Sequence, residues 1–340
     1  MTDRPWWDPA RHADRRPLLL TRNRIRRALT DWFEAEGFTE ADPACLVAVP
    51  AAEVHLHALK VTTTAPDLTT GRAWLQTSPE FALKKLIAAG ETRLFSFARV
   101  WRDREGGPRH ATEFTMLEWY RADADYTQLM EDCATVLRIA AEAAGTTVFR
   151  HRDARCDPYA PLRRVTLAEA FAAEGIDLLA TLPETDPAPL AAALTRAGIP
   201  HRPGDSWSDL FSKALIERIE PALGPAATIL DRYPAPEAAL ARRTPDDPRT
   251  AERFELFACG VELANAFGEL TDPAEQRARF TADMALRARL YGEAYPIDED
   301  LLDALGHMPP TSGIALGFDR LVMLATGAPR LTDIMWSPPA

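Results

Sequence analysis

The stretch Glu113-Phe-Thr-Met-Leu-Glu-Trp-Tyr120 indicates the fold more strongly than any other part of the sequence. Successive side chains on a strand point to opposite faces. The even-numbered residues from Phe114 to Tyr120 therefore share one face, and the odd-numbered residues from Thr115 to Trp119 share the other. Both faces are largely apolar, which is typical of a central strand that is covered on each side.

Regular elements are expected on both sides of this strand. The aromatic-rich stretch Arg93–Arg102 is strand-like, and the loop signal Glu105-Gly-Gly-Pro108 predicts that the two strands form an antiparallel hairpin. Helical spacing, caps and turn residues predict the remaining elements. These are a helix over Arg24–Phe33 that ends near Gly37, an extended piece ending at Pro43, a helix with Ser78 as N-cap and Pro79 first, a helix over Thr127–Ala144 closed by Gly145, a strand pair over Phe254–Leu263 turning near Gly260, and a final helix from Gly317.

Length and composition are typical of a folded protein in the cytoplasm. The 340 residues suit one large domain, and 46% of them are hydrophobic. The first residues do not resemble a signal peptide, and no apolar run is long enough to span a membrane. The four cysteines form no C-x-x-C pair, which argues against a zinc site, and Cys133 is expected in the core. The net charge of −11 disfavours a nucleic-acid partner.

Residues 160 to 245 are rich in Ala, Pro and Leu, so we expect a helical insertion there.

Two glutamates of the N-terminal half stand out. Glu118 lies on the central strand, where a buried carboxylate is costly unless it is paired. The strand alone favours an internal ion pair with an arginine, and the alternative is an acidic pocket for a ligand cation. Glu80 lies in the first turn of its helix, where the helix dipole alone explains an acid.

The segment Glu255–Glu269 contains further polar residues in apolar surroundings. If the chain turns near Gly260, Glu255 and Glu262 face each other, and close carboxylates repel unless a cation such as Mg²⁺ lies between them. Arg102 ends a strand, and the small residues before Arg320 allow a ligand to approach the backbone, so both arginines are candidates for phosphate contacts. His55 and His57 form an H-x-H pair without an evident third ligand, so packing roles are favoured over a metal site.

Taken in order, several motifs resemble the catalytic domain of class II lysyl-tRNA synthetases. The resemblance is closest to a truncated branch of that family, the elongation factor P (R)-β-lysine ligases. It covers about three quarters of the chain and rests on several runs of residues. These are Thr77-Ser-Pro-Glu80, Arg109-His110, Glu113–Arg121, Gly260-Val-Glu-Leu-Ala-Asn265, Glu269-Leu-Thr-Asp272, Glu275-Gln276 and Gly313-Ile-Ala-Leu-Gly-Phe-Asp-Arg320.

The resemblance implies an α+β fold, with an antiparallel sheet of six or seven strands flanked by helices, and a homodimer formed through residues 24–43. It also implies a site for ATP, Mg²⁺ and a lysine-like amino acid. Arg102 and Arg320 are the implied catalytic residues, and Glu255 and Glu262 the implied Mg²⁺ ligands. The implied ATP contacts are Arg102, His110, Phe114, Glu262, Leu263, Gly317 and Arg320. The implied amino-acid contacts are Glu80, near the reacting end, with Glu118, Tyr120, Asn265, Glu269 and Ala315 around the far end.

Two features favour a ligase over a synthetase. The sequence before Arg24 is too short for the anticodon-binding barrel of the synthetases, so we expect no such domain and no tRNA partner. Ala315 stands where the synthetases have glycine and the ligases have alanine. The expected function is therefore transfer of an activated lysine-like acid to elongation factor P. The alternatives are the same chemistry on a carrier protein or small amine, or an amino-acid-binding protein without catalysis.

The sequence also departs from the family at the nucleotide end of the site. The family's arginine-x-glutamate is Arg102-Asp103-Arg104 here, and an arginine cannot accept a hydrogen bond from the adenine amino group. Ala111 likewise replaces an asparagine of the family. Glu105 is expected to replace the lost carboxylate if the loop is shifted by one residue.

Overall fold

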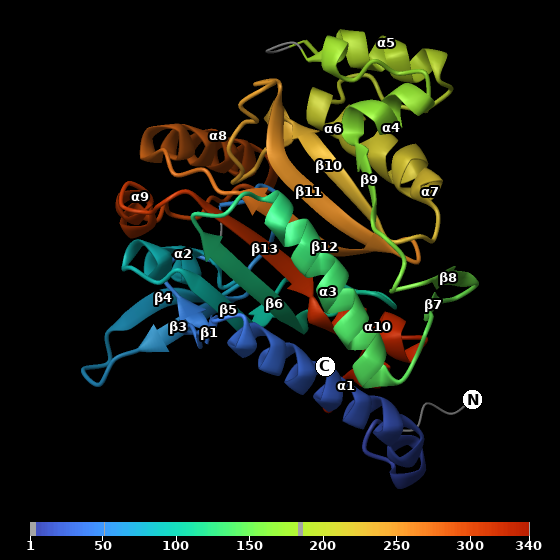
Figure 1. The fold of residues 1–340 in the computed structure, drawn as a ribbon. Helices are drawn as coiled ribbons and strands as arrows, with labels where there is room; N and C mark the ends of the chain where they lie inside the picture. Colours follow the sequence, from blue (N-terminus) through green and yellow to red (C-terminus); the bar gives the residue numbers. More distant parts are fainter. Residues whose placement is uncertain (1–4, 51, 183–185, 340) are drawn as a thin grey trace.

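The computed structural model describes residues 5–50, 52–182 and 186–339. One large sheet runs through the molecule and is covered by helices on both faces (Figure 1). The expected α+β class is confirmed, as is the central position of the Glu113–Tyr120 strand.

Within the described residues, eight strands form this sheet, in the order β1-β5-β6-β13-β12-β11-β10-β9. Neighbours are antiparallel except for the two edge pairs, β1 with β5 and β9 with β10, which are parallel. The six central strands, from β5 to β10 in this order, are antiparallel as the family resemblance implied, and the short, polar strands β1 and β9 add one parallel pair at each edge. The strands are β1 Thr39–Glu40, β5 Arg93–Trp101, β6 Glu113–Ala122, β9 Arg163–Thr166, β10 Thr228–Pro234, β11 Thr250–Ala258, β12 Val261–Gly268 and β13 Thr311–Gly317.

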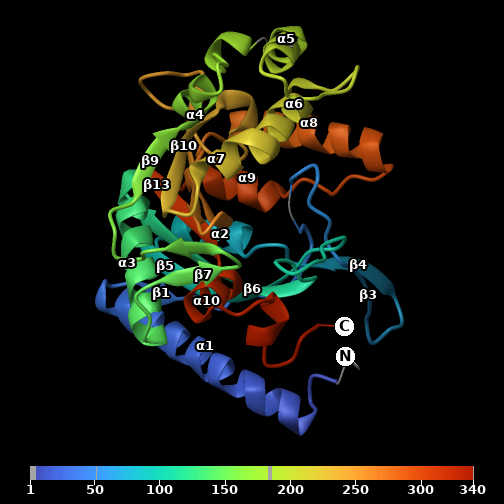
Figure 2. The same cartoon turned by 90° about the vertical axis from the view of Figure 1, so that its right-hand side faces the viewer.

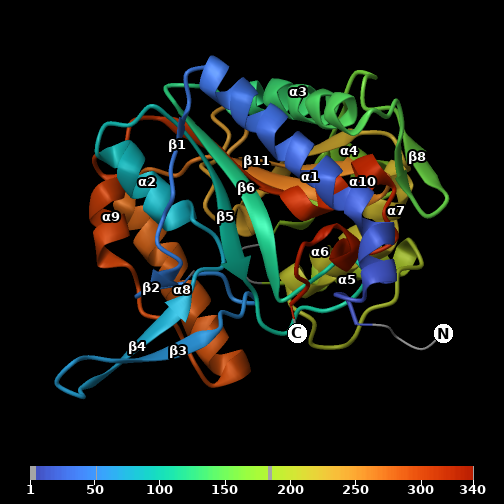
Figure 3. The same ribbon diagram turned by 90° about the horizontal axis from the view of Figure 1, so that it is seen from below.

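Three helices cover the face of the sheet on which Leu117 and Trp119 lie. They are α1 Pro9–Ala35, α3 Thr127–Ala144 and α10 Phe318–Thr326, and they pack against one another (Figure 3). The α3 and α10 predictions are confirmed, and Cys133 is buried in this core. Helix α1 begins already at Pro9, where Asp8 accepts a hydrogen bond from the Arg11 amide at 3.0 Å. Its first half was missed because Pro17 and several arginines interrupt the apolar pattern.

The opposite face, which carries Tyr120, is only partly covered. Helices α2 Glu80–Ala88, α8 Pro273–Tyr291 and α9 Glu299–Leu305 lie together there and share a second apolar cluster with Tyr120. The helix begins one residue later than expected, so Pro79 and not Ser78 is the N-cap of α2, although the Ser78 hydroxyl still accepts a hydrogen bond from the Glu80 amide at 3.0 Å. The rest of this face stays open toward the candidate site.

The expected insertion is helical only in its middle part. Helices α4 Leu167–Ala173, α5 Ala188–Arg196, α6 Trp207–Ala214 and α7 Glu220–Leu223 gather at the end of the molecule opposite α1 (Figure 2). Near its two ends the 160–245 stretch forms the edge strand β9 and the neighbouring strand β10, so the predicted boundaries were too wide. Strand β10 is buried along its length and therefore shows no alternation that would have revealed it.

Smaller elements complete the fold. Strands β2 Leu46–Val47, β3 Lys60–Thr64 and β4 Thr70–Leu75 form a separate small sheet, and β7 Phe149–His151 pairs with β8 Ala154–Cys156. The small residues that precede Arg320 lie on strand β13, in the middle of the large sheet. None of the helices in the described ranges has the length and apolar character that a membrane crossing requires.

A buried ion pair fixes α3 against the central strand. Asp132 accepts hydrogen bonds from Arg121 at 2.8 and 2.9 Å and from the Trp119 indole at 2.9 Å. Asp132→Asn should therefore lower the free energy of unfolding by about 3–5 kcal/mol, because it leaves the Arg121 guanidinium buried without its counter-charge.

The neighbouring exposed acid offers a matched control. Glu131→Gln should change the free energy of unfolding, measured by urea denaturation, by less than about 0.5 kcal/mol. Equal effects of the two substitutions would show that the ion pair contributes little.

Candidate active site

A cleft of about 330 Å³ opens on the uncovered face of the large sheet. Its walls come from β6, β11, β12, β13, the start of α10 and the loops before α2 and β6. Most of the site residues that the sequence predicted line it. They are Glu80, Arg102, His110, Phe114, Glu255, Glu262, Leu263, Asn265, Ala315, Gly317 and Arg320.

The pairing of the strands explains why predicted residues that are far apart in sequence meet here. Glu255 pairs with Asn265, Asn265 with Ala315, and Ala315 with Glu118. Paired residues on neighbouring strands point to the same face, so these four side chains form one row. Glu255, Asn265 and Ala315 line the cleft, and Glu118 continues the row behind the cleft wall.

Two arginines, Arg102 and Arg320, lie at one end of the cleft, the arginine end. The Arg102 guanidinium lies 5.3 Å from the centre of the Phe114 ring, and its buried Nε atom has no hydrogen-bond partner in the described part of the chain. Arg320 donates to the main-chain oxygen of Glu262 at 2.9 Å and to its carboxylate at 3.3 Å. Both guanidinium groups line the cleft and can therefore meet a bound anion.

The loop between β5 and β6 turns Glu105 rather than Arg104 into the cleft. Arg104 has a φ of 63°, and its guanidinium lies near His57, at 3.4 Å, and over the Tyr291 ring. Glu105 lines the cleft, and its carboxylate lies 2.7 Å from the Nδ1 atom of His110, a hydrogen bond that lowers the pKa of Glu105. Glu105 therefore faces the cleft and Arg104 does not.

Glu255 and Glu262 both line the cleft, on the hairpin that turns at Gly260 as expected. They do not pair with each other, because Glu255 lies opposite Asn265 and Glu262 opposite Phe257. Burial, with a further contribution from the nearby Glu262 charge, raises the pKa of Glu255 to about 7. Each carboxylate contacts one arginine: Glu255 contacts Arg253 at 2.9 Å, and Glu262 contacts Arg320. Hard cations such as Mg²⁺ prefer carboxylate oxygens, and phosphate oxygens of a bound nucleotide would complete a site that two carboxylates begin. The residues therefore fit this ion.

Three predicted residues, Glu118, Tyr120 and Glu269, are buried behind the cleft wall instead of lining it. Glu118 accepts hydrogen bonds from the Ser78 hydroxyl at 2.6 Å and the Tyr120 hydroxyl at 3.0 Å. The expectation of an ion pair between Glu118 and an arginine was wrong, since no such pair occurs among the residues that the structure describes.

Lys84 is a site residue that the sequence analysis missed. Its side chain is 2% exposed, and its ammonium lies 2.6 Å from a carboxylate oxygen of Glu80 and 2.7 Å from one of Glu269. Burial alone would lower the pKa of Lys84, but these two carboxylates outweigh burial and raise it. Glu80 and Lys84 are four residues apart on one helix, a spacing that predicts this contact.

The histidine pair does not form a metal site. The Nδ1 atom of His57 is 3.1 Å from Arg287, while His55 is 2.7 Å from the Tyr291 hydroxyl. In the described ranges, no group of three or more His, Cys, Asp or Glu side chains is arranged to hold a metal. The packing roles favoured from the sequence are therefore consistent with the structure.

Comparisons with known proteins place the chain among synthetases and ligases. A family model described as class II tRNA synthetases (D, K and N) matches residues 3–339. The lysine–tRNA ligase of Pelotomaculum thermopropionicum is 34% identical over 94% of this chain, which spans 62% of that relative's length. The elongation factor P–(R)-β-lysine ligase of Edwardsiella ictaluri is 34% identical over 98% of both chains, and that of Vibrio cholerae is 34% identical over 99% of both.

The environment of Glu118 predicts a pH dependence of stability. Burial, followed by the Glu80 charge, raises the pKa of Glu118 to about 8. A carboxyl group whose folded pKa is raised contributes stability below its unfolded pKa and loses it as the pH rises through the folded value. Glu118→Gln keeps a neutral group at every pH. Its free energy of unfolding should therefore rise relative to the parent's by about 1 kcal/mol per pH unit between pH 6 and 8.

Urea denaturation at several pH values measures this difference. Glu113→Gln, on the same strand but with a side chain that is 39% exposed, is the control and should follow the parent curve. If the Glu118→Gln and parent curves run parallel from pH 6 to 8, Glu118 is not held neutral.

Proposed function

Because the chain belongs to the class II tRNA synthetase family of the D, K and N type, we propose that it is an ATP-dependent ligase. It activates a lysine-like amino acid, (R)-β-lysine or lysine, as its adenylate and transfers it to a lysine side chain of elongation factor P. One observation carries this proposal: Glu255, Asn265, Ala315 and Glu118 form a single row across the sheet, which runs from the cleft to the buried acid Glu118. The relatives whose names contain elongation factor P, matched over almost their whole lengths, support the acceptor.

The amino acid is proposed to bind between the row and α2. Its carboxylate faces Arg102, one ammonium lies near Glu80, and the terminal ammonium lies at the end formed by Glu118, Tyr120, Asn265 and Glu269, with Ala315 on the floor. Buried carboxylates select a lysine-like acid, because a neutral side chain would leave them unpaired. Three of these groups lie behind the wall, so the terminal ammonium reaches them only after Ser78 or Lys84 shifts.

ATP is proposed to bind at the arginine end of the cleft. Phe114 and Arg320 enclose the adenine, with Leu263, Gly317 and Glu262 on the sheet side and His110 near the phosphates. Glu105 accepts the hydrogen bond of the adenine amino group in place of the glutamate that Arg104 replaces. The cleft position of Glu105 supports ATP use and weighs against a binding protein without catalysis.

The two chemical steps need positioning and charge stabilisation. First, a carboxylate oxygen of the amino acid attacks the α-phosphorus, and the bond to pyrophosphate breaks. Arg102 and Arg320 stabilise the negative charge that develops on the phosphate oxygens. Glu255 and Glu262 would hold Mg²⁺, which supplies further neutralisation of phosphate charge when bound. In the second step the acceptor amine attacks the adenylate carbonyl carbon, AMP leaves, and the amine releases a proton.

Exchange of labelled pyrophosphate into ATP tests the first step. The protein should support exchange when lysine or (R)-β-lysine is present and not without an amino acid. Mass spectrometry of elongation factor P, incubated with the protein, ATP and the same acids, should then show the mass gain of one aminoacyl group.

From the family resemblance we also propose a homodimer formed through residues 24–43. Light scattering on the purified protein alone tests this proposal.

The outcomes separate the alternatives. No exchange with any diamino acid would remove the ligase proposal altogether. Exchange without a mass gain on elongation factor P would instead favour another acceptor, such as a carrier protein or a small amine.

Glu269→Gln tests the amino-acid pocket. Removing one charge from a buried, paired group typically costs about 3–5 kcal/mol, so the affinity for lysine-like acids should fall at least roughly a hundredfold. ATP affinity, measured alone by calorimetry, should barely change because Glu269 lies away from the arginine end. Glu142→Gln, an exposed acid on α3, is the control. If the Glu269 variant binds lysine-like acids as tightly as the parent does, Glu269 is not part of the amino-acid pocket.

A further inference from the structure

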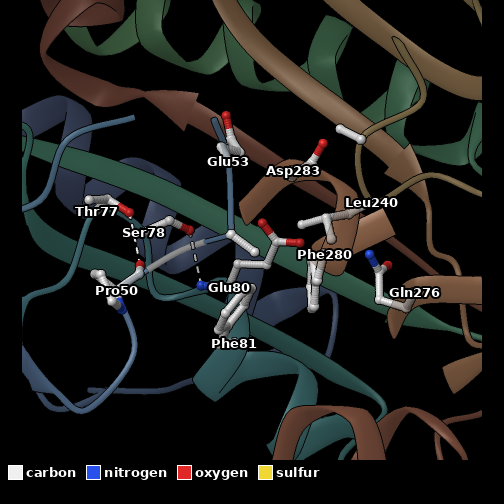
Figure 4. A pocket seen from close by; sticks show the side chains of 12 residues that line it. Pro50, Glu53, Thr77, Ser78, Glu80, Phe81, Leu240, Gln276, Phe280 and Asp283 are labelled. Atoms are coloured by element: carbon white, nitrogen blue, oxygen red, sulfur yellow. Dashed lines mark hydrogen bonds between the residues drawn. The ribbon is translucent and has the colours of Figure 1, made fainter. Parts of the chain in front are cut away.

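A second, smaller cavity of about 40 Å³ lies next to the cleft and shares Glu53, Ser78 and Glu80 with its wall. Figure 4 shows the Glu80 carboxylate on one side of this cavity and the Gln276 amide on the other, with Leu240 and Phe280 between them in this view. A cavity of this size exceeds the volume that a single water molecule needs. It therefore has room for a small polar head together with a methylene group.

Gln276 is the most informative residue of the cavity. It lies on the first turn of α8, its side chain lines the cavity, and the residue is 1% exposed. Neither polar atom of its amide has a hydrogen-bond partner within the described residues. Leaving a buried amide without partners costs free energy, so such a group in a cavity indicates a missing ligand.

The charges around the cavity indicate the sign of that ligand. Glu53, Glu80 and Asp283 all line it. Burial, followed by the Glu53 charge, raises the pKa of Asp283 to about 6. One oxygen of Glu80 already contacts the Lys84 ammonium, whereas Gln276 still offers a carbonyl oxygen. A cation with hydrogen-bond donors would relieve the repulsion between the acids and satisfy the amide oxygen.

The apolar residues restrict the kind of cation. Phe81, Leu240 and Phe280 form part of the wall, and they favour a methylene group over a hydrated metal ion. A primary ammonium on a short alkyl stem satisfies both the polar and the apolar parts.

We infer that Gln276 and Asp283 extend the Glu80 end of the site through this cavity and determine specificity for the ammonium group nearest the carboxyl end of the activated amino acid. The inference rests on the proposed function, because the amino acid must lie in the cleft with its carboxylate toward Arg102. It adds two residues of α8 to the site and gives the unpartnered amide a ligand. The terminal ammonium, at the other end of the acid, does not contact this cavity.

The test compares ligands that differ only in this ammonium. 6-Aminohexanoate has the chain and terminal ammonium of lysine but lacks the amino group near the carboxylate. Dissociation constants of lysine, (R)-β-lysine and 6-aminohexanoate are measured by calorimetry for the parent and for Gln276→Leu and Asp283→Asn. Asp300→Asn, an exposed acid on α9, is the matched control.

Both variants should weaken binding of at least one diamino acid by roughly tenfold, which corresponds to about 1.4 kcal/mol. Binding of 6-aminohexanoate should stay within about twofold of the parent, which also shows that the variant is folded. Whichever diamino acid loses more identifies the position of the amino group that enters the cavity.

Two results would overturn the inference. Either all three ligands lose affinity equally, which indicates general damage to the site, or no ligand loses affinity in either variant. A failure of the proposed function looks different, because the parent protein itself would then neither bind a diamino acid nor exchange pyrophosphate.

Discussion

The ammonium of Lys84 lies between the carboxylates of Glu80 and Glu269, and the buried end of the site depends on this contact. A carboxylate without a counter-charge in such a position would take up a proton or destabilise the fold. Even with Lys84 beside it, burial raises the pKa of Glu269 to about 7. Glu118, which has only hydroxyl donors, has a higher pKa of about 8. The chain therefore keeps three acids together by sharing one internal cation and leaving the third acid close to neutral.

This arrangement requires the strands to pair in one register. A slip of one residue on β13 would move its side chains to the other face and separate the row of paired residues. The side chains around Gly313, on the same strand, are closely packed. A Cβ atom there would lie 2.3 Å from the Tyr120 ring and 2.4 Å from a Glu269 oxygen. The small residue at this point allows Tyr120 and Glu269 to approach each other behind the cleft wall.

The sequence was informative where local pattern and tertiary environment agree. The central strand, its hairpin and α3 could be predicted because alternation, loop residues and caps indicate the same elements. The edge strands β1 and β9 could not, because they are short, polar and held only by their neighbours. The partner of Glu118 was wrongly predicted for a related reason. Ser78 is 40 residues away in the chain, and no local pattern indicates that its hydroxyl reaches the strand.

The loop after Arg102 shows how a substitution that removes a functional group can be offset by the backbone. Arg104 adopts a positive φ, which is uncommon for a residue with a side chain, and its guanidinium lies against Tyr291 and His57 outside the cleft. The next residue, Glu105, consequently faces the cleft, where His110 holds its carboxylate. A hydrogen-bond acceptor is therefore present at the arginine end of the cleft although the family position holds an arginine. What the proposed ATP site requires is a carboxylate at a place in the cleft, and a change in backbone conformation can supply it from a neighbouring position in the sequence.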